Sequence, residues 1–242
     1  MSLAHEKYLE LQRLRNADPI TLEPHHTALV IIDMQEYFLH PDSPLSRACD
    51  AQVPGVLHYF QEHGRSVAEP TLQRLLGVFR THGMRVVYTT VASELPDGGD
   101  LMPILRRRNE MAHAAVQEPY IPHKDDAWAR IVPSLTPQSN ELVINKTTYG
   151  TFTSTGLDRA LRNMGISTLV IGGVVTNVCV ETTARDAADH GYNVVVVDDA
   201  CAAFSPEIHE AALVSFQGPF GRVRSADEVI ALIAQGTSAS QR

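Results

Sequence analysis

Five stretches of the chain consist of consecutive apolar residues, and each ends in a polar residue or a glycine-rich turn. Their residues are mostly β-branched and do not alternate with polar ones, which predicts strands buried on both faces of a parallel sheet. The predicted strands are 27–33, 85–91, 141–145, 167–175 and 193–199. A weaker run at 221–225 predicts a short sixth strand.

Segments in which apolar residues recur at helical spacing lie between these strands. Strands that alternate with helices form right-handed βαβ crossovers. The sequence therefore predicts a three-layer α/β/α fold with a six-stranded, mainly parallel, doubly wound sheet. The predicted helices are 69–82, 153–165, 177–190, 207–217 and 225–235.

Three segments fit this alternation less well. Residues 1–20 predict an N-terminal helical arm, and residues 36–68, rich in Pro, His and Asp, predict loops over the sheet. Residues 92–127 predict an insertion around a short helix, of the kind that forms a lid or a subunit contact. No repeat or low-complexity linker divides the chain, so a single domain is expected over 1–242.

The overall composition narrows the class of function. The chain has 242 residues, of which 44% are hydrophobic, and 20 Lys and Arg against 28 Asp and Glu give a net charge of −8. This charge has the wrong sign for a general nucleic-acid binder. No run reaches the roughly 18 apolar residues of a membrane span, and the N-terminus is too charged for a signal peptide. We expect a cytoplasmic protein without a nucleic-acid or membrane partner.

The three cysteines, Cys49, Cys179 and Cys201, are odd in number and far apart in the sequence. They lack C-x-x-C spacing, which argues against a disulfide framework and against a structural zinc site. Each cysteine is therefore considered as a thiol.

Three chemically active side chains follow predicted strands. Asp33 ends the first run, Lys146 ends the third, and Cys179 lies four residues past the fourth. In open α/β sheets, ligands bind outside the carboxyl ends of the strands. A carboxylate can take the proton of a thiol and later protonate an amine leaving group, and a nearby ammonium favours both charged forms. Taken singly, Asp33 fits a turn-forming residue and Lys146 a solvent-facing charge.

Cys179 is the most informative of the three. Thr176 or Asn177 is expected to cap the following helix, which places the thiol in its first turn. Free backbone N–H groups and the helix dipole there favour a thiolate and lower the thiol pKa. A buried cysteine that acts as a small hydrophobe is the alternative.

These residues belong to longer motifs, VIIDMQ, KTTYGTF and GGVVTNVCVETTARDA, in that order within 27–216. The combination resembles the isochorismatase-like superfamily of hydrolases, and specifically its cysteine amidohydrolase branch. The resemblance implies a six-stranded parallel sheet and an Asp33, Lys146, Cys179 catalytic triad. It also implies a cis peptide between Val174 and Val175, an oxyanion hole formed by the amides of Val175 and Cys179, and a homodimer or homotetramer.

The resemblance also narrows the substrate. Nicotinamidases of the superfamily carry a D-x-H metal motif after the second strand, and the corresponding stretch TTVASELPDGGD contains no His. We therefore expect no metal, and no cofactor because no G-x-G-x-x-G follows a strand. The predicted function is thioester-forming hydrolysis of a small-molecule amide, a ureido or N-carbamoyl compound, with release of ammonia. The alternatives are a vinyl-ether hydrolase of the isochorismatase type and a non-catalytic small-molecule-binding subunit.

Four residues are candidates for binding the substrate. Gln35 lies one turn past Asp33 and can donate to a substrate carbonyl or cap the loop, while Tyr149 and Phe152 are candidates for lining the pocket, with a place in the core as the alternative. The basic run 106–108 can meet a substrate carboxylate through bidentate hydrogen bonds, with Arg107 as the candidate. A solvated helix face or a subunit contact is the alternative for this run.

Overall fold

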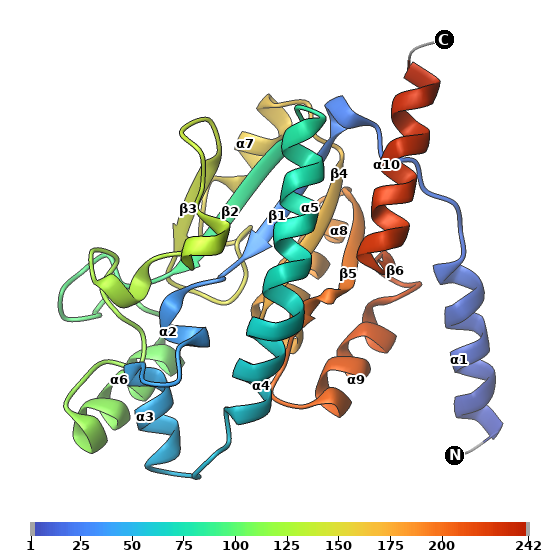
Figure 1. Cartoon of the computed structure of the whole chain (residues 1–242). Coiled ribbons are helices and arrows are strands. Elements are labelled where there is room, and N and C mark those ends of the chain that lie inside the picture. Colours follow the sequence, from blue (N-terminus) through green and yellow to red (C-terminus); the bar gives the residue numbers. More distant parts are fainter. Residues whose placement is uncertain (1–2, 241–242) are drawn as a thin grey trace.

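One parallel sheet forms the centre of the computed structural model, which describes residues 3–240 (Figure 1). Its strand order is β3-β2-β1-β4-β5-β6, and every neighbouring pair is parallel. The predicted six-stranded sheet is confirmed, including its short last strand. The strands are β1 (Thr27–Ile32), β2 (Arg85–Val91), β3 (Leu142–Lys146), β4 (Thr168–Val174), β5 (Asn193–Ala202) and β6 (Arg222–Arg224).

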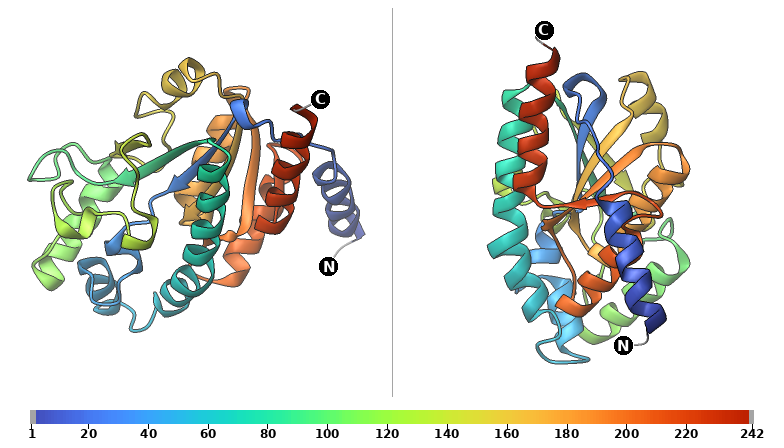
Figure 2. Two further views of the ribbon diagram at one scale, coloured as in Figure 1. Left: turned by 45° about the horizontal axis from the view of Figure 1, so that its top comes forward. Right: turned by 90° about the vertical axis from the view of Figure 1, so that its right-hand side faces the viewer.

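Helices cover both faces of this sheet (Figure 2). Helices α5 and α10 pack on one face, and α7, α8 and α9 pack on the other. The predicted doubly wound, three-layer arrangement is therefore confirmed. The helices are α1 (Leu3–Asn16), α2 (Glu36–Leu39), α3 (Pro44–Asp50), α4 (His58–His63), α5 (Glu69–Thr81), α6 (Pro103–Val116), α7 (Leu157–Asn163), α8 (Glu181–Asp189), α9 (Pro206–Phe216) and α10 (Ala226–Ser240).

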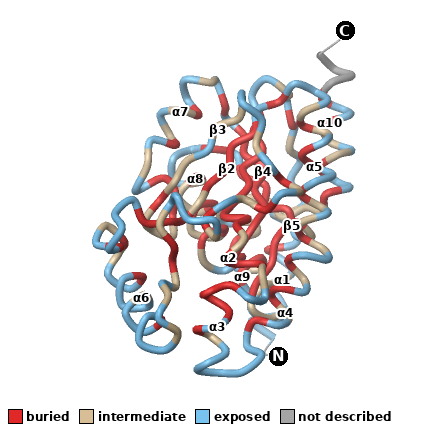
Figure 3. The backbone as a smooth tube through the Cα atoms, turned by 60° about the vertical axis from the view of Figure 1, so that its left-hand side comes forward, coloured by how far each residue is buried: buried red, intermediate tan, exposed pale blue. Residues whose placement is uncertain are grey.

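The uninterrupted apolar runs follow from this burial on both faces. In β1, Leu29 and Ile31 join the core under α5, while Val30 joins the core under α7 and α8. Because successive side chains of a strand point to opposite faces, a strand covered on both sides has no solvent-facing position. All six residues of β1 and all seven of β4 are buried, and Figure 3 shows the strands as the buried centre of the molecule.

The strand order reverses between β1 and β4. The chain runs outward through β1, β2 and β3, returns to the centre at β4, and continues to the opposite edge through β5 and β6. Such a reversal leaves a crevice beyond the carboxyl ends of the two central strands. Asp33 and the segment that contains Cys179 follow these two strands.

The segment 36–68 differs from the prediction of loops. It contains α2, α3, α4 and a π-helical turn, Gly64–Ala68. Most of its large apolar side chains are buried in the core, among them Tyr37, Leu45 and Phe60, while Val53 and Val56 are exposed. Prolines and short polar stretches break the helical period of this segment, so it did not stand out in the sequence as helices.

Two other irregular segments also take a definite form. The segment 92–127 consists of α6 between two irregular stretches, and α1 lies beside β6 at the edge of the sheet. No helix among the described residues is long and apolar enough to cross a membrane.

Candidate active site

Asp33 lies directly after β1 with its side chain fully buried. Its backbone adopts a left-handed conformation with φ of 50°, which Asp tolerates better than most residues. One carboxylate oxygen accepts a hydrogen bond from the Thr89 hydroxyl at 2.6 Å, and the other accepts one from the Lys146 ammonium at 2.7 Å. These two bonds fix the orientation of the carboxylate at the end of the central strand.

Lys146 ends β3, which is separated from β1 by β2. Its side chain extends across the end of β2, so that the ammonium reaches Asp33 and also donates to the Thr148 carbonyl at 3.1 Å. Burial lowers the pKa of Lys146 and is the largest single influence, but Asp33 and Cys179 together hold that pKa above its ordinary value. The ion pair is buried on both sides, and each charge compensates the other.

Cys179 lies in a π-helical turn, Thr176–Val180, which leads from the end of β4 into α8. Both Asp33 and Lys146 lie near enough to the thiol to shift its pKa. The structure thus brings the three predicted residues together at the reversal point. The expected capping is wrong: the turn begins after Val175, without a side-chain cap, and the Thr176 hydroxyl bonds to His209 instead.

The protonation of Cys179 also differs from the expectation. Burial raises the pKa of this thiol to about 12, although Lys146 lowers it, and the Asp33 carboxylate raises it further. The sequence favoured a lowered pKa from the helix dipole, but loss of solvent outweighs the dipole at this buried position. The resting side chain is therefore a neutral thiol beside a buried carboxylate, which can accept the thiol proton.

The backbone that connects β4 to the cysteine has a special shape. The peptide bond between Val174 and Val175 is cis, as the resemblance implied. Gly173 precedes it with φ of +128°, and a Cβ atom at this position would lie 2.1 Å from the Ile32 carbonyl oxygen. Only glycine fits this close approach of β4 to the end of β1, so the motif needs a glycine just before the turn that contains Cys179.

A cavity of about 360 Å³ opens above Cys179. Its walls are largely apolar and aromatic, which is typical of small-molecule sites. They come from the ends of the central strands, from the segments 36–68 and 92–127, and from the start of α8. The lining residues are Phe38, Val91, Leu105, Arg108, Tyr120, Ile121, Tyr149, Val175, Asn177, Val178, Cys179, Thr182 and Phe204.

Of the four predicted substrate-binding residues, Tyr149 lines this cavity, whereas Gln35, Phe152 and Arg107 do not. The side-chain amide of Gln35 donates to the Ala129 carbonyl at 2.7 Å and accepts from the Val91 N–H at 2.8 Å. These backbone bonds tie a loop to the end of β2. Gln35 is therefore a buried structural brace and has no free group directed at a substrate.

The other two corrections have simple causes. Phe152 packs in the core beneath α7 and α8, where its ring lies 5.7 Å from the Tyr192 ring. Arg108 takes the place predicted for Arg107, because on α6 it lies one turn past Leu105, on the side that faces the cavity. Its guanidinium carbon lies 5.7 Å from the centre of the Tyr120 ring.

Sequence reasoning also missed Thr89, which orients Asp33. The signal was present: Thr89 is a polar residue in the apolar run of β2, and its neighbour on β1 is Ile32, the residue before Asp33. Polar groups inside a buried strand need a partner, and the end of the next strand supplies one.

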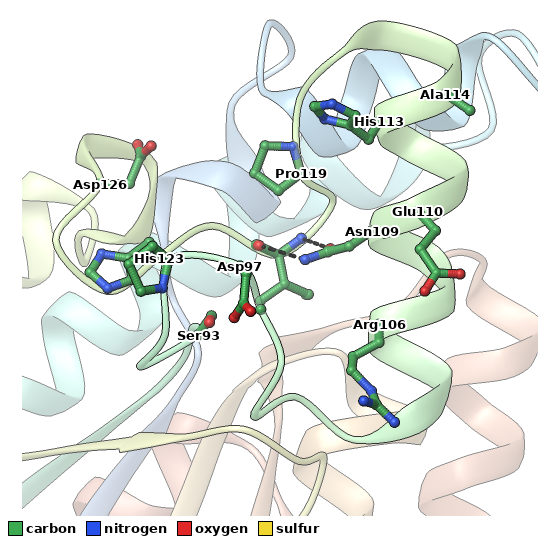
Figure 4. A pocket seen from close by; sticks show the side chains of 13 residues that line it. Ser93, Asp97, Arg106, Asn109, Glu110, His113, Ala114, Pro119, His123 and Asp126 are labelled. Atoms are coloured by element: carbon green, nitrogen blue, oxygen red, sulfur yellow. Dashed lines mark hydrogen bonds between the residues drawn. The ribbon is translucent and has the colours of Figure 1, made fainter.

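A second, larger cavity of about 750 Å³ lies on another side of α6 (Figure 4). Arg106, Asn109, Glu110 and His113 of α6 line it, together with residues of 93–98 and 119–126. Asn109 is already bonded to the backbone of Ile121 in both directions. This cavity contains neither Cys179 nor the Asp33–Lys146 ion pair.

Among the described residues, His, Cys, Asp and Glu side chains form no group of three that could hold a metal.

The sequence is similar to a known protein family and to named members of it. Residues 27–228 match the model of the isochorismatase domain. The chain is 31% identical over 210 residues to the ureidoacrylate amidohydrolase RutB of Methylobacterium radiotolerans, with 85% of this chain and 79% of the relative covered.

Solved structures show the same fold. A cysteine hydrolase from Pseudomonas syringae pv. phaseolicola 1448A superposes with a TM-score of 0.72 at 26% identity, covering 91% of this chain and 99% of that chain. The N-carbamoylsarcosine amidase of Thermoplasma acidophilum superposes with a TM-score of 0.59, also at 26% identity, covering 84% of this chain and 97% of that chain.

Proposed function

The chain belongs to the isochorismatase family of hydrolases, and from this premise we propose that it is a cysteine-dependent amidohydrolase of small ureido or N-carbamoyl compounds. The observation that carries the proposal is the meeting of Asp33, Lys146 and Cys179 at the base of a cavity of about 360 Å³. The amidohydrolase names of relatives such as RutB support the reaction class.

The acylation step follows from the protonation states. Cys179 starts as a neutral thiol, so Asp33 takes its proton as the sulfur forms a bond to the substrate carbonyl carbon. The carbonyl oxygen becomes negative, and the N–H groups of Val175 and Cys179 donate hydrogen bonds to it. Asp33 then returns the proton to the leaving nitrogen, the C–N bond breaks, and ammonia departs from a thioester.

The second half of the reaction reverses these roles. Asp33 takes a proton from water as the water oxygen attacks the thioester carbonyl, the C–S bond then breaks as the acid product forms, and Asp33 returns the proton to the sulfur. Throughout both steps Lys146 keeps a positive charge beside Asp33 and the sulfur, which stabilises the carboxylate and the transient thiolate.

Arg108 supports a more specific substrate class. It brings a guanidinium to a cavity whose other walls are largely aromatic and aliphatic. A guanidinium binds a carboxylate through two parallel hydrogen bonds. We therefore favour a ureido or N-carbamoyl acid, with its amide at Cys179 and its carboxylate at Arg108.

The decisive experiment is an ammonia-release assay with the wild-type protein, Cys179→Ala and Cys49→Ala. The panel contains ureido acids, N-carbamoyl amino acids and neutral ureas, with a chelator present throughout. We expect turnover by the wild type and by Cys49→Ala, and a loss of at least about a thousandfold in Cys179→Ala. Turnover that survives in Cys179→Ala would contradict the thiol mechanism. A wild type that releases no ammonia from any of these compounds would favour the two alternatives, a vinyl-ether hydrolase or a non-catalytic binding subunit.

Two further predictions from the sequence stay predictions: a cytoplasmic location, and assembly as a homodimer or homotetramer. In the structure, α6 and the residues around it form one wall of the candidate active site. Their predicted role as a subunit contact is open to measurement by light scattering at several protein concentrations.

A further inference from the structure

A chain of hydrogen bonds lies behind the catalytic turn and outside the substrate cavity. The His209 ring on α9 bonds through Nε2 to an Asp198 carboxylate oxygen on β5 at 2.7 Å. Through Nδ1 the same ring bonds to the Thr176 hydroxyl at 2.9 Å. Three elements that are separate in the sequence thus meet at one imidazole ring, and none of these three residues lines the cavity above Cys179.

The chemistry of the partners assigns each member a role. A carboxylate oxygen accepts hydrogen bonds, so Nε2–H of His209 donates a hydrogen bond to Asp198. In this tautomer Nδ1 accepts, and the Thr176 hydroxyl donates a hydrogen bond to it. The Thr176 side chain is therefore held in one orientation by a ring that is itself oriented by a carboxylate.

The exposure of the three side chains decreases along the chain. The Asp198 side chain is 55% exposed, that of His209 is 16% exposed, and Thr176 is 1% exposed. The relay thus connects a solvated carboxylate in the middle of β5 to a buried hydroxyl in the catalytic turn. Helix α9 packs against that turn and holds the ring in place.

Thr176 does not perform the function that a threonine usually has at the start of a helix. Threonines at this point commonly cap free backbone N–H groups. Here the residue at the cap position is Val175, without a side-chain cap bond, and the Thr176 hydroxyl is directed toward α9. The hydroxyl therefore anchors the turn to the neighbouring helix.

We propose that Asp198, His209 and Thr176 form a positioning relay that holds the turn Thr176–Val180 in the geometry required for oxyanion stabilisation. Thr176 directly follows Val175 and lies three residues before Cys179, so it stands between the two N–H groups assigned to the oxyanion hole. The inference rests on the proposed amidase function. It assigns no contact with substrate to these three residues and acts through the backbone alone.

The test compares variants of the full-length protein with the amide that the wild type hydrolyses fastest. Thr176→Val removes the hydroxyl at nearly constant shape, Thr176→Ser keeps it, and His209→Leu removes its acceptor. Glu210→Gln, an exposed neighbour on α9, serves as the matched control. We expect kcat to fall about tenfold to a hundredfold in Thr176→Val and in His209→Leu, with KM within about twofold. Thr176→Ser should regain kcat to within about threefold of the wild type.

The double variant adds a second criterion. Because both substitutions break one relay, Thr176→Val with His209→Leu should lose no more than about twice what the more impaired single variant loses. A kcat for Thr176→Val within twofold of the wild type would overturn the relay, as would equal losses in Thr176→Val and Thr176→Ser.

The control for folding is the thermal midpoint of each variant. If His209→Leu does not fold, the comparison of Thr176→Val with Thr176→Ser still decides, since Val replaces only the hydroxyl of Thr and Ser keeps that hydroxyl while it loses the methyl group. An inactive wild type would overturn the proposed amidase and this inference together. An active wild type with unchanged kcat in Thr176→Val would overturn this inference alone.

Discussion

At the scale of single residues, Lys146 and Asp33 have a structural role besides the catalytic role proposed for them. Both side chains are fully buried and their charged atoms lie 2.7 Å apart. A buried charge is tolerated only with its partner, so removal of one partner leaves the other uncompensated. The stability of the fold therefore depends on keeping both charges of this ion pair.

We predict that Lys146→Met lowers the free energy of unfolding by about 3–5 kcal/mol and abolishes turnover. Urea unfolding followed by circular dichroism measures the first effect. Lys124→Met is the matched control, because the Lys124 and Glu94 side chains are each 45% exposed, and solvent-screened pairs of this kind contribute little to stability. Similar losses in both variants would contradict the buried character of the Lys146 pair.

The pKa of Cys179 gives a prediction about pH. With a pKa of about 12, only about one thiol in ten thousand is ionised at pH 8. The rate at which iodoacetamide alkylates Cys179, followed by mass spectrometry without substrate, should rise about tenfold per pH unit from pH 7 to pH 11. In the urea-unfolded protein the rate should level off near pH 9. A plateau below pH 8 in the folded protein would instead indicate a stabilised thiolate.

At the scale of elements, the end of β4 is shaped by one glycine. Gly173 has φ of +128° and lies against the backbone of Ile32, the residue before Asp33. Backbone atoms cannot rotate away as a side chain does, so an added methyl group must separate β4 from β1. This separation would move Asp33 and the cysteine turn apart.

We therefore predict that Gly173→Ala lowers the free energy of unfolding by at least about 3 kcal/mol. Gly77→Ala in α5 is the control: a Cβ there meets nothing within 4 Å, and alanine favours helices over glycine by about 1 kcal/mol. Chemical denaturation of Gly173→Ala and Gly77→Ala measures both changes in the free energy of unfolding. A tolerated Gly173→Ala would mean that the two strands can separate without cost.

At the scale of the whole molecule, the cavity is assembled from parts far apart in the sequence. Phe38 and Arg108 come from the two irregular segments, while Tyr149, Cys179 and Phe204 come from turns after three of the strands. The sheet supplies the reacting groups, and the irregular segments supply the walls. We expect substrate specificity to reside in those segments.

Substitution of Arg108 tests whether the irregular segments determine substrate specificity. For a substrate with a carboxylate, Arg108→Gln should raise KM about tenfold to a hundredfold. This factor corresponds to the binding free energy of a charge-assisted hydrogen-bonded pair. For a neutral amide of similar size the same change should have little effect. Arg107→Gln, on the adjacent position of α6 and outside the cavity, should leave both KM values within about twofold. Equal effects of the two substitutions would contradict a carboxylate site at Arg108.

The sequence by itself determined the order of the strands and of the helices that cover the sheet, and it placed Asp33, Lys146 and Cys179 at or just past strand ends. Apolar periodicity and strand-end polarity are local properties, so they can be read without knowing which segments meet. Only the tertiary structure decided which polar side chains reach the cavity. Arg108 reaches it in place of Arg107, and the Gln35 side chain is hydrogen-bonded to the backbone instead. It also decided that Cys179 rests as a thiol and that Thr176 bonds to His209. These outcomes depend on desolvation and on contacts between distant segments, which arise from packing and are not encoded in the local pattern.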